Sequence, residues 1–581
     1  MPFIGSHYFP GPGEAVNVND AALLAPPPQG GLPLLLVGPA TDGAPQTALP
    51  ITTPSQAVRV LKGGDLLQAA LLALATSPPP ATLTVIRPEA ATPATSAIKD
   101  SGSTDQIALT TTSYGTVANS AKWQVAASTS PGYSVTQGLD FSGPGGVTFP
   151  NIGPLTVGLI PLTLQYTGTG TAPTATVTDA AITVKATTSD TGGTVTFTTG
   201  MTVQQLANQI NQLPGWVATV TDPNPNDLVL PTDMVPGTTT ASLPALLDNV
   251  SAVTVSTTTP TSLTAHVAAV VRWFNGQAGY FTAVRQANAT ALATATSWTY
   301  ATGGTTPSAT NTNWQSAYTV AQTLPGAWIV VPVSSSSAIW AMNDAHCHYM
   351  ASLGAPRRGY LGDALGATEA TEITDAGALN SNRSTLLWPG LGGTNYNGQA
   401  TTFAPYLVAA SVGAARAGTV IDRALTQQPV ASIFTGLEQP TTPGMVAQGL
   451  TGGVAVLTRN PQGQIVLSQD RTTWLQSPAV DKVENSTGLV IDTITVALNT
   501  LLAQFLGQPL DAYLLETATQ ELLIALQDFY SLGYLVVEPS AGDVALQQSG
   551  TTAITGSVTL YPTTPTNYIT VTLNAVSAAA A

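Results

Sequence analysis

The chain has 581 residues, a length that allows three or four domains of roughly 150 residues each. Only 8% of the residues are charged, against about 25% in ordinary soluble domains, while 44% are hydrophobic and the net charge is −15. A surface this poor in charge suggests either that other copies of the chain cover it or that it is the Thr-rich β surface of a secreted protein. The 16 Lys and Arg residues form no basic run, which argues against direct nucleic-acid binding.

Cysteine content and the terminal sequence bear on the cellular compartment. The single cysteine, Cys347, excludes an internal disulfide framework and fits assembly in a reducing cytoplasm. The N-terminal sequence has neither the basic region nor the apolar region of a secretory signal. The longest apolar stretches, such as 66–75, are too short to span a bilayer, so we expect no direct membrane insertion.

The first hundred residues predict strands and helices in alternation. The apolar run at 32–37 lies between two glycines, as is typical of a strand buried on both faces. Thr53, Pro54 and Gln56 combine an N-cap, a first-turn proline and a capping-box residue, and Asp65 is placed to cap a second helix that ends near residue 77. With a further strand at 82–87, this order predicts a parallel crossover.

Residues 101–265 have a different composition. They contain no Arg, no Glu and only two lysines, and apolar residues alternate with polar ones between Gly and Pro turns. This pattern predicts an almost all-β region with a hairpin around Gly192 and Gly193, one short helix at 203–213 and a strand at 216–221.

After about residue 265 the alternation of helices and strands returns, which predicts one α/β domain interrupted by a β-rich insertion. The predicted elements are an amphipathic helix within 266–286 that Gly276 and Gly279 break, helices at 314–323, 336–354 and 404–417, and strands at 327–333 and 386–388.

The C-terminal part predicts a hairpin, two helices and a final strand. The hairpin pairs 454–458 with 464–468, and apolar residues share one face in each of two helices, at 490–505 and 515–529. Residues 567–576 alternate apolar and polar side chains. A strand at the extreme terminus needs a partner edge.

A search for chemistry finds no phosphate-binding loop, no nucleophile elbow and no zinc-protease motif. His346, Cys347 and His348 form the most tempting cluster, but residues two apart on a helix point to different sides, so a packed or surface helix is the favoured interpretation. The acidic segment 222–227 lacks the central Gly and distal Glu of a calcium loop, and a turn is favoured. We therefore expect no catalytic residue, no cofactor and no metal.

Four arginines are the best charged candidates for a binding role: Arg357, Arg358, Arg416 and Arg423. Arg416 and Arg423 are seven residues apart, so one helix face could present both. Ion pairing at the surface of the chain itself is one interpretation. The alternative is that they meet acidic groups on a neighbouring subunit.

The order of these segments resembles the tail sheath family of contractile phages. The segment 51–88 is similar to the sheath pattern of a Thr-rich entry, a helix ending in Gly, a long apolar helix and a strand ending V-x-R. Further similar segments are Tyr114-Gly115 with Asn119, Gly303-Gly304 followed by 314–318 and the strand IVVPV, the Ala-rich helix within 403–419, the segment 452–474, and the closing NYITVTL. The opening departs from the usual P-G-V-Y-x-x-E, and the insertion matches only loosely.

The resemblance implies a multidomain fold of α/β and α+β parts, with a discontinuous α/β core. The expected divisions are an N-terminal arm (1–20), the first part of the core (21–104), a β-rich, outward-facing insertion that could form two subdomains (105–265), the second part of the core (266–440), a C-terminal α+β domain facing an inner tube (441–562) and a C-terminal strand arm (563–581).

The resemblance also implies a function. A sheath protein is a structural subunit, not an enzyme: it polymerises as stacked hexameric rings around the tail tube, and its contraction drives the tube through the host envelope for genome ejection. The expected partners are other copies of the chain, the tail tube protein, and the baseplate and tail terminator proteins, in a virion tail assembled in the host cytoplasm. The alternatives are the sheath of a phage-derived injection particle and, in a different class, a secreted Thr-rich adhesin.

The terminal arms of sheath proteins add strands to sheets of neighbouring subunits, a mode in which backbone hydrogen bonds supply the affinity. The residues of this chain placed to do so are Val16, Val18, Ile569, Val571 and Leu573. Arg416 and Arg423 would supply ion pairs to a neighbouring subunit or to the tube.

Overall fold

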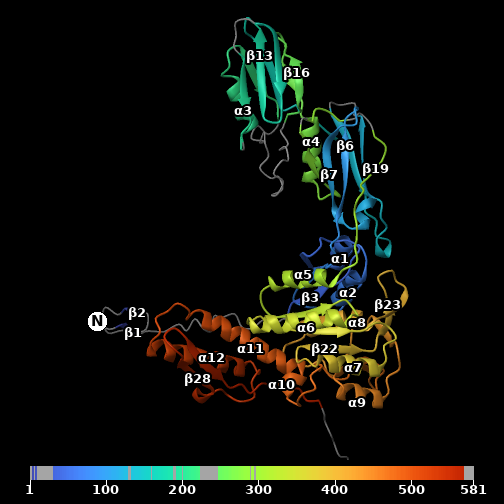
Figure 1. Ribbon diagram of the computed structural model, residues 1–581, viewed down its shortest axis with the longest axis vertical. Helices are drawn as coiled ribbons and strands as arrows, with labels where there is room; N and C mark the ends of the chain where they lie inside the picture. Colours follow the sequence, from blue (N-terminus) through green and yellow to red (C-terminus); the bar gives the residue numbers. More distant parts are fainter. Residues whose placement is uncertain are drawn as a thin grey trace, which may run out of the picture. The chain divides into compact units, whose positions relative to one another are not determined.

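The computed structural model describes residues 3–4, 7–8, 31–127, 132–158, 160–187, 192–198, 200–222, 247–287, 289–292 and 296–567. The chain divides into two compact units. The core unit comprises Met1–Ala40, Gln46–Glu89 and Ala309–Ala581, and the inserted unit comprises Thr41–Pro45 and Ala90–Ser308. The fold is a mixture of α/β and β-rich parts (Figure 1), as the sequence predicted.

The core unit is built on a sheet of eight strands, in which six central parallel strands lie between one antiparallel strand at each edge. In spatial order the strands are β27 (Ile465–Leu467), β26 (Val454–Arg459), β22 (Ser384–Trp388), β21 (Arg357–Gly362), β20 (Trp328–Pro332), β3 (Leu34–Val37), β5 (Leu83–Ile86) and β4 (Ala48–Ile51). The parallel pairing of β3 with β5 confirms the crossover predicted from the first hundred residues.

Helices cover both faces of this sheet, because its parallel strands are apolar on both sides. Leu34 and Leu36 of β3 face one hydrophobic core, whereas Leu35 and Val37 face another. The first face is covered by α2 (Asp65–Leu74) and α8 (Pro405–Gly418), with α1 (Pro54–Leu61) against α2. The second is covered by α5 (Asn311–Gln322), α6 (Ser337–Ser352), α7 (Glu369–Leu379) and α9 (Pro443–Thr451).

The C-terminal part contains α10 (Val480–Val483), α11 (Asn485–Ala503), α12 (Ala512–Ser531) and the hairpin of β28 (Val544–Gln548) with β29 (Ile554–Val558). The core unit also contains a small sheet of β24 (Ala400–Phe403), β23 (Leu391–Thr394) and β25 (Phe434–Leu437).

Helix α11 has 19 residues and is long and apolar enough, by length and composition alone, to cross a membrane, with a mean hydropathy of 1.4 over an 18-residue window. The sequence expectation that no stretch reaches that length considered only uninterrupted apolar runs. Leu489, Val490 and Ile494 of α11 lie in the main hydrophobic core, and its Asp492 forms ion pairs with two arginines. These contacts are those of a core helix.

The inserted unit contains two hydrophobic cores. The first joins β6 (Pro93–Lys99), β7 (Asp105–Tyr114), β8 (Ala121–Ala127), β9 (Tyr133–Leu139), β10 (Ile152–Val157), α4 (His266–Gly276), β18 (Phe281–Arg285) and β19 (Thr299–Tyr300). The second joins β11 (Leu162–Tyr166), β12 (Thr171–Val177), β13 (Ala181–Thr187), β14 (Gly193–Thr196), α3 (Val203–Ile210), β15 (Trp216–Val220), β16 (Val250–Thr254) and β17 (Thr261–Leu263).

The unit boundaries differ from the divisions expected from sequence. Residues 266–308 were expected in the α/β core, but α4 packs in the first core of the inserted unit and β18 pairs with β7. The expected division at residue 441 also falls inside one unit, because β26 and β27 belong to the eight-stranded sheet. Gly276 ends the helix as expected, and the residues after Gly279 form a strand instead of more helix.

Candidate functional site: open sheet edges and the C-terminal half

Neither edge of the eight-stranded sheet offers a complete free ladder to a further strand. At one edge, β4 carries the exposed Pro50, which has no backbone N–H to donate. At the other edge, the segment 426–430 covers β27 through bridges from Thr426 to Leu467 and from Pro429 to Val466. A strand from another molecule would meet a ladder interrupted at Pro50 on one edge and a covered ladder on the other.

The hairpin β28–β29 is different. Its two strands pair along five residues each, and no further strand borders either of them within the part of the chain that the structure describes. Val544 is buried against α12, and this contact holds the hairpin on the core unit. The other residues of β28 and β29 are partly or fully exposed. Two open edges on a supported sheet are what strand addition requires.

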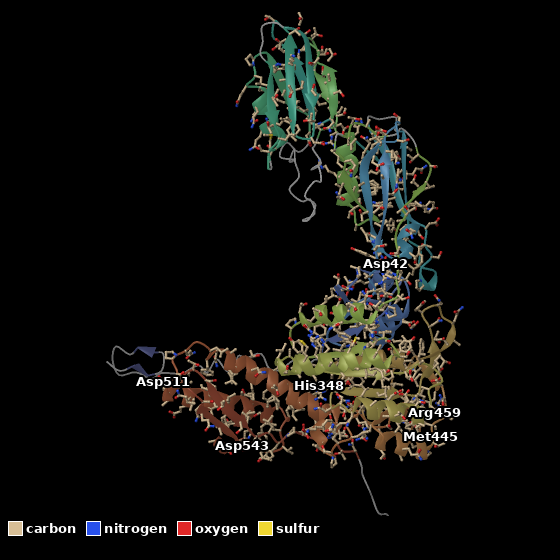
Figure 2. The ribbon with its side chains drawn as sticks, viewed as in Figure 1. Asp42, His348, Met445, Arg459, Asp511 and Asp543 are labelled. Carbon is tan, nitrogen blue, oxygen red and sulfur yellow. The ribbon has the colours of Figure 1, made fainter. Side chains whose placement is uncertain are left out.

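An apolar groove of about 480 Å³ lies between this hairpin and the facing ends of α11 and α12. Its lining includes Leu498, Leu502, Phe505, Leu514, Ile554 and Val558. At the α11–α12 connection, Leu506 is 82% exposed and Tyr513 is 77% exposed. Asp511, labelled in Figure 2, begins α12 there by accepting a hydrogen bond at Oδ1 from the Leu514 amide (2.7 Å). The C-terminal half thus presents an apolar surface beside its open strands.

Buried ion pairs fasten α11 to the sheet. Arg358 donates from Nε to Asp492 Oδ2 (2.8 Å), and Arg383 donates from Nη2 to Asp492 Oδ1 (3.0 Å). The Asp492 carboxylate therefore pairs with two guanidinium groups, that of Arg358 on β21 and that of Arg383 just before β22. Because the pairs are largely removed from water, loss of either partner would leave a buried charge.

Arg416 is likewise a buried residue of its own chain. It is 0% exposed, and its guanidinium lies 3.3 Å from Asp470 Oδ2 and donates to the carbonyl of Val420 (2.6 Å). Asp470 also accepts from the Tyr360 hydroxyl (3.0 Å). This burial corrects the prediction that Arg416 meets another subunit or a tube. Arg423 is exposed and donates to Gln428 (3.0 Å), so its predicted role stays a proposal.

Comparison with known proteins identifies the fold. No protein-family model and no curated protein matches the chain. Among solved structures, it is similar to a sheath tail protein of Listeria innocua (14% identity, TM-score 0.55, covering 93% of this chain and 94% of that one) and to one of Desulfitobacterium hafniense (13% identity, TM-score 0.53, covering 95% and 96%). The chain has the fold of a sheath tail protein. The likeness spans the core unit and the inserted unit together, since almost all of each chain is covered.

The strand residues expected from the sheath resemblance are Val16, Val18, Ile569, Val571 and Leu573, and all of them lie outside the described residues. The description of the chain ends at Asn567, two residues before Ile569. Sequence reasoning missed the hairpin β28–β29. In β28 only the first four residues alternate between buried or half-buried and exposed positions, and β29 has three exposed residues in a row, so the period-2 signal of a half-buried strand is weak.

The His-Cys-His cluster is divided between two sides of α6, as its spacing predicted. His346 is buried and accepts from Arg357 Nη1 at Nε2 (2.8 Å), and burial lowers the pKa of His346 to about 3. His348, labelled in Figure 2, lies on the other side of α6 near Asp344. Among the described residues, no group of three or more His, Cys, Asp or Glu side chains is placed to hold a metal ion.

A buried acid in α7 was also missed from the sequence. Glu372 is 0% exposed, and neither carboxylate oxygen has a hydrogen-bond partner. Burial raises the pKa of Glu372 to about 9, and the carboxylates of Asp363, Asp375 and Glu438 add to this rise by repulsion. The signal for its burial is its position four residues before the buried Ala376, on the same helix face.

Proposed function

We propose that the chain is the structural subunit of a contractile tail sheath, many copies of which assemble as stacked hexameric rings around a tail tube. The observation that carries this proposal is the likeness of nearly the whole chain, insertion included, to two sheath tail proteins. The open hairpin and the exposed apolar residues of the C-terminal half support it, because both are features of a surface that other molecules cover.

In this proposal the terminal arms of neighbouring copies complete the hairpin β28–β29. The hairpin is the proposed acceptor because both of its strands are unbordered in the described residues and an apolar groove lies beside it. An added strand alternates its side chains between two faces, so Ile569, Val571 and Leu573 would all lie on the same face. In this proposal that face covers the apolar groove, which is lined by Ile554 and Val558 of β29.

The proposal takes the strand from another copy, because the described chain leads away from the groove after β29. After β29 it passes Leu535 and reaches Asn567, which is hydrogen-bonded to Glu484 just before α11. Leu502, in the groove, is 18 residues along α11 from Glu484, or about 27 Å. Leu573 is six residues beyond Asn567 and reaches at most about 21 Å, which falls short of Leu502.

The wider assembly belongs to the same proposal. The inserted unit faces outward, the C-terminal half faces the tube, and the baseplate and tail terminator proteins bound the stack of rings in a virion tail assembled in the host cytoplasm. Contraction is then a change in the angles between subunits, which hinge-like strand contacts tolerate, and it drives the tube through the host envelope. The role is structural and needs no catalytic residue.

Electron microscopy of the purified protein tests the proposal. We expect the full chain to form tubes on concentration and a variant lacking 568–581 to remain a folded monomer, because the deletion removes the donated strand. Deletion of 577–581 is the matched control: it removes five residues and keeps 567–576. Normal tubes from the 568–581 deletion would refute the strand-addition model, and a full chain that stays monomeric at high concentration would refute the sheath role.

A further inference from the structure

The segment after β29 is fastened to the core unit at several points before it reaches the C-terminal arm (568–581). Tyr561 accepts from the amide of Val536 (2.8 Å), and Pro562 bridges to Leu535. The amide of Thr563 donates to the Tyr534 carbonyl (3.0 Å). The segment therefore follows the end of α12 toward the start of α11.

The last fastening point is a carboxylate. Glu484, the residue before α11, is only 3% exposed, and its Oε1 accepts from the Asn567 amide Nδ2 (2.7 Å) and from the Gln469 amide. A buried carboxylate is costly unless donors satisfy it, so these two amides hold the charge in place. Burial raises the pKa of Glu484, while the hydrogen bonds from Gln469 and Asn567 act in the opposite direction.

Asn485, the residue after Glu484, connects the start of α11 to the eight-stranded sheet. Asn485 donates from Nδ2 to Thr385 Oγ1 of β22 (2.7 Å) and to Asp470 Oδ1 (3.0 Å). Seven residues further along α11, Asp492 pairs with Arg358 of β21. A force applied at Asn567 would thus pass through Glu484 and α11 into the parallel sheet.

We infer that Glu484 is a positioning residue for assembly. By binding Asn567, this clamp fixes the point at which the C-terminal arm leaves the core unit. A force on the arm then passes to the eight-stranded sheet instead of to the hairpin β28–β29. This inference rests on the proposed sheath function. The hairpin receives the arm of one neighbour while the arm of the same chain is donated to another. The clamp separates these two forces: without it, a pull on the arm would act on the backbone hydrogen bonds of Tyr561 and Thr563 and, once these open, on Val558 of β29.

An exchange of donor and acceptor tests the clamp. Asn567→Asp places a second carboxylate against Glu484. Asn567 and Gln469 both donate to Glu484 Oε1, so in the double variant Glu484→Gln, Asn567→Asp the new amide nitrogen takes the place of Oε1 and donates to the carboxylate at position 567. The Gln469 amide then turns over and presents its oxygen to the same nitrogen, which reverses the roles at both contacts. We expect hydrogen exchange of the 560–567 amides in the unassembled chain to rise about tenfold or more in N567D, the scale of losing a hydrogen bond to a charged group, and to return in the double variant. The exposed neighbour provides the control, Thr566→Ala, which should change nothing.

Assembly provides the second measurement. N567D should form fewer or irregular tubes, and the double variant should form normal ones; Asn567→Ala gives the same comparison without added charge if N567D does not fold. Unchanged exchange and unchanged tubes in N567D and N567A would overturn the clamp and leave the sheath role standing. Normal tubes from the 568–581 deletion would instead show that the arm is not needed for assembly, a distinct result that the clamp variants do not produce.

Discussion

Replacing Glu372 by glutamine should make the core unit more stable at neutral and alkaline pH. The carboxyl group of Glu372 lies buried in α7, with neither oxygen hydrogen-bonded and with Asp363, Asp375 and Glu438 nearby. Burial raises its pKa from 4.5 to about 9, so the native chain holds Glu372 as a neutral acid at pH 7. Glutamine has nearly the same shape and cannot ionise.

The sign and size follow from proton linkage. The folded-state pKa lies above the unfolded one, so the stability contributed by the bound proton is fully present below about pH 4.5 and is lost as the pH rises toward about 9. Between pH 5 and pH 8 the wild type crosses about three pKa units at 1.36 kcal/mol each, a loss of roughly 4 kcal/mol relative to the Gln variant. At pH 5 the two chains should be almost equally stable.

Urea denaturation of the unassembled protein at pH 5, 6, 7 and 8 measures this difference. Trp340 and Trp388 lie in the same hydrophobic core as α7, so tryptophan fluorescence reports on this region. The exposed Glu516→Gln in α12 is the control, and it should follow the wild type. If Glu372→Gln and the wild type lose stability in parallel from pH 5 to 8, Glu372 is ionised in the native chain and the reasoning fails.

Asp492→Ala should lower the free energy of unfolding by about 3–5 kcal/mol, because it leaves Arg358 and Arg383 buried without a counter-charge. The exposed Asp528→Ala on α12 should stay within about 0.5 kcal/mol in the same denaturation experiment, and an equal effect of both variants would contradict the buried-pair account. Burial also raises the pKa of Cys347 to about 12, so a thiol reagent should react with it only after denaturation; rapid labelling of the native chain would show that α6 is open.

Local signals in the sequence located the secondary structure well. Thr53 accepts from the Gln56 amide at the start of α1, as predicted, although the Gln56 side chain accepts from Thr52 instead of closing the box on Thr53. Helix α5 begins three residues before its predicted start, because Thr310 and Asn313 form a capping box in which Asn takes the usual place of Glu or Gln. Such caps involve neighbours within four residues and can be inferred from a short window.

Contacts between distant residues were not predictable in this way. Asp65 was expected to cap α2, but Gly64 holds that position with φ at 86°, and the Asp65 carboxylate accepts from the hydroxyl of Tyr406, 341 residues later. Arg416 was expected at a surface, and its partner Asp470 is 54 residues away. A helix covered on several sides gives its polar residues the same spacing as an exposed one, so spacing alone could not reveal the burial.

The inserted unit begins and ends at paired strands. Thr92 and Thr305 form an antiparallel bridge, with the amide of Thr92 3.0 Å from the Thr305 carbonyl, and Thr95 pairs with Thr302 in the same way. The incoming and outgoing chains are therefore about 5 Å apart at this neck. A foreign domain whose own ends lie equally close could replace residues 96–301 without a long connector. The paired segments are therefore a natural grafting point for displaying cargo on a polymer of this subunit.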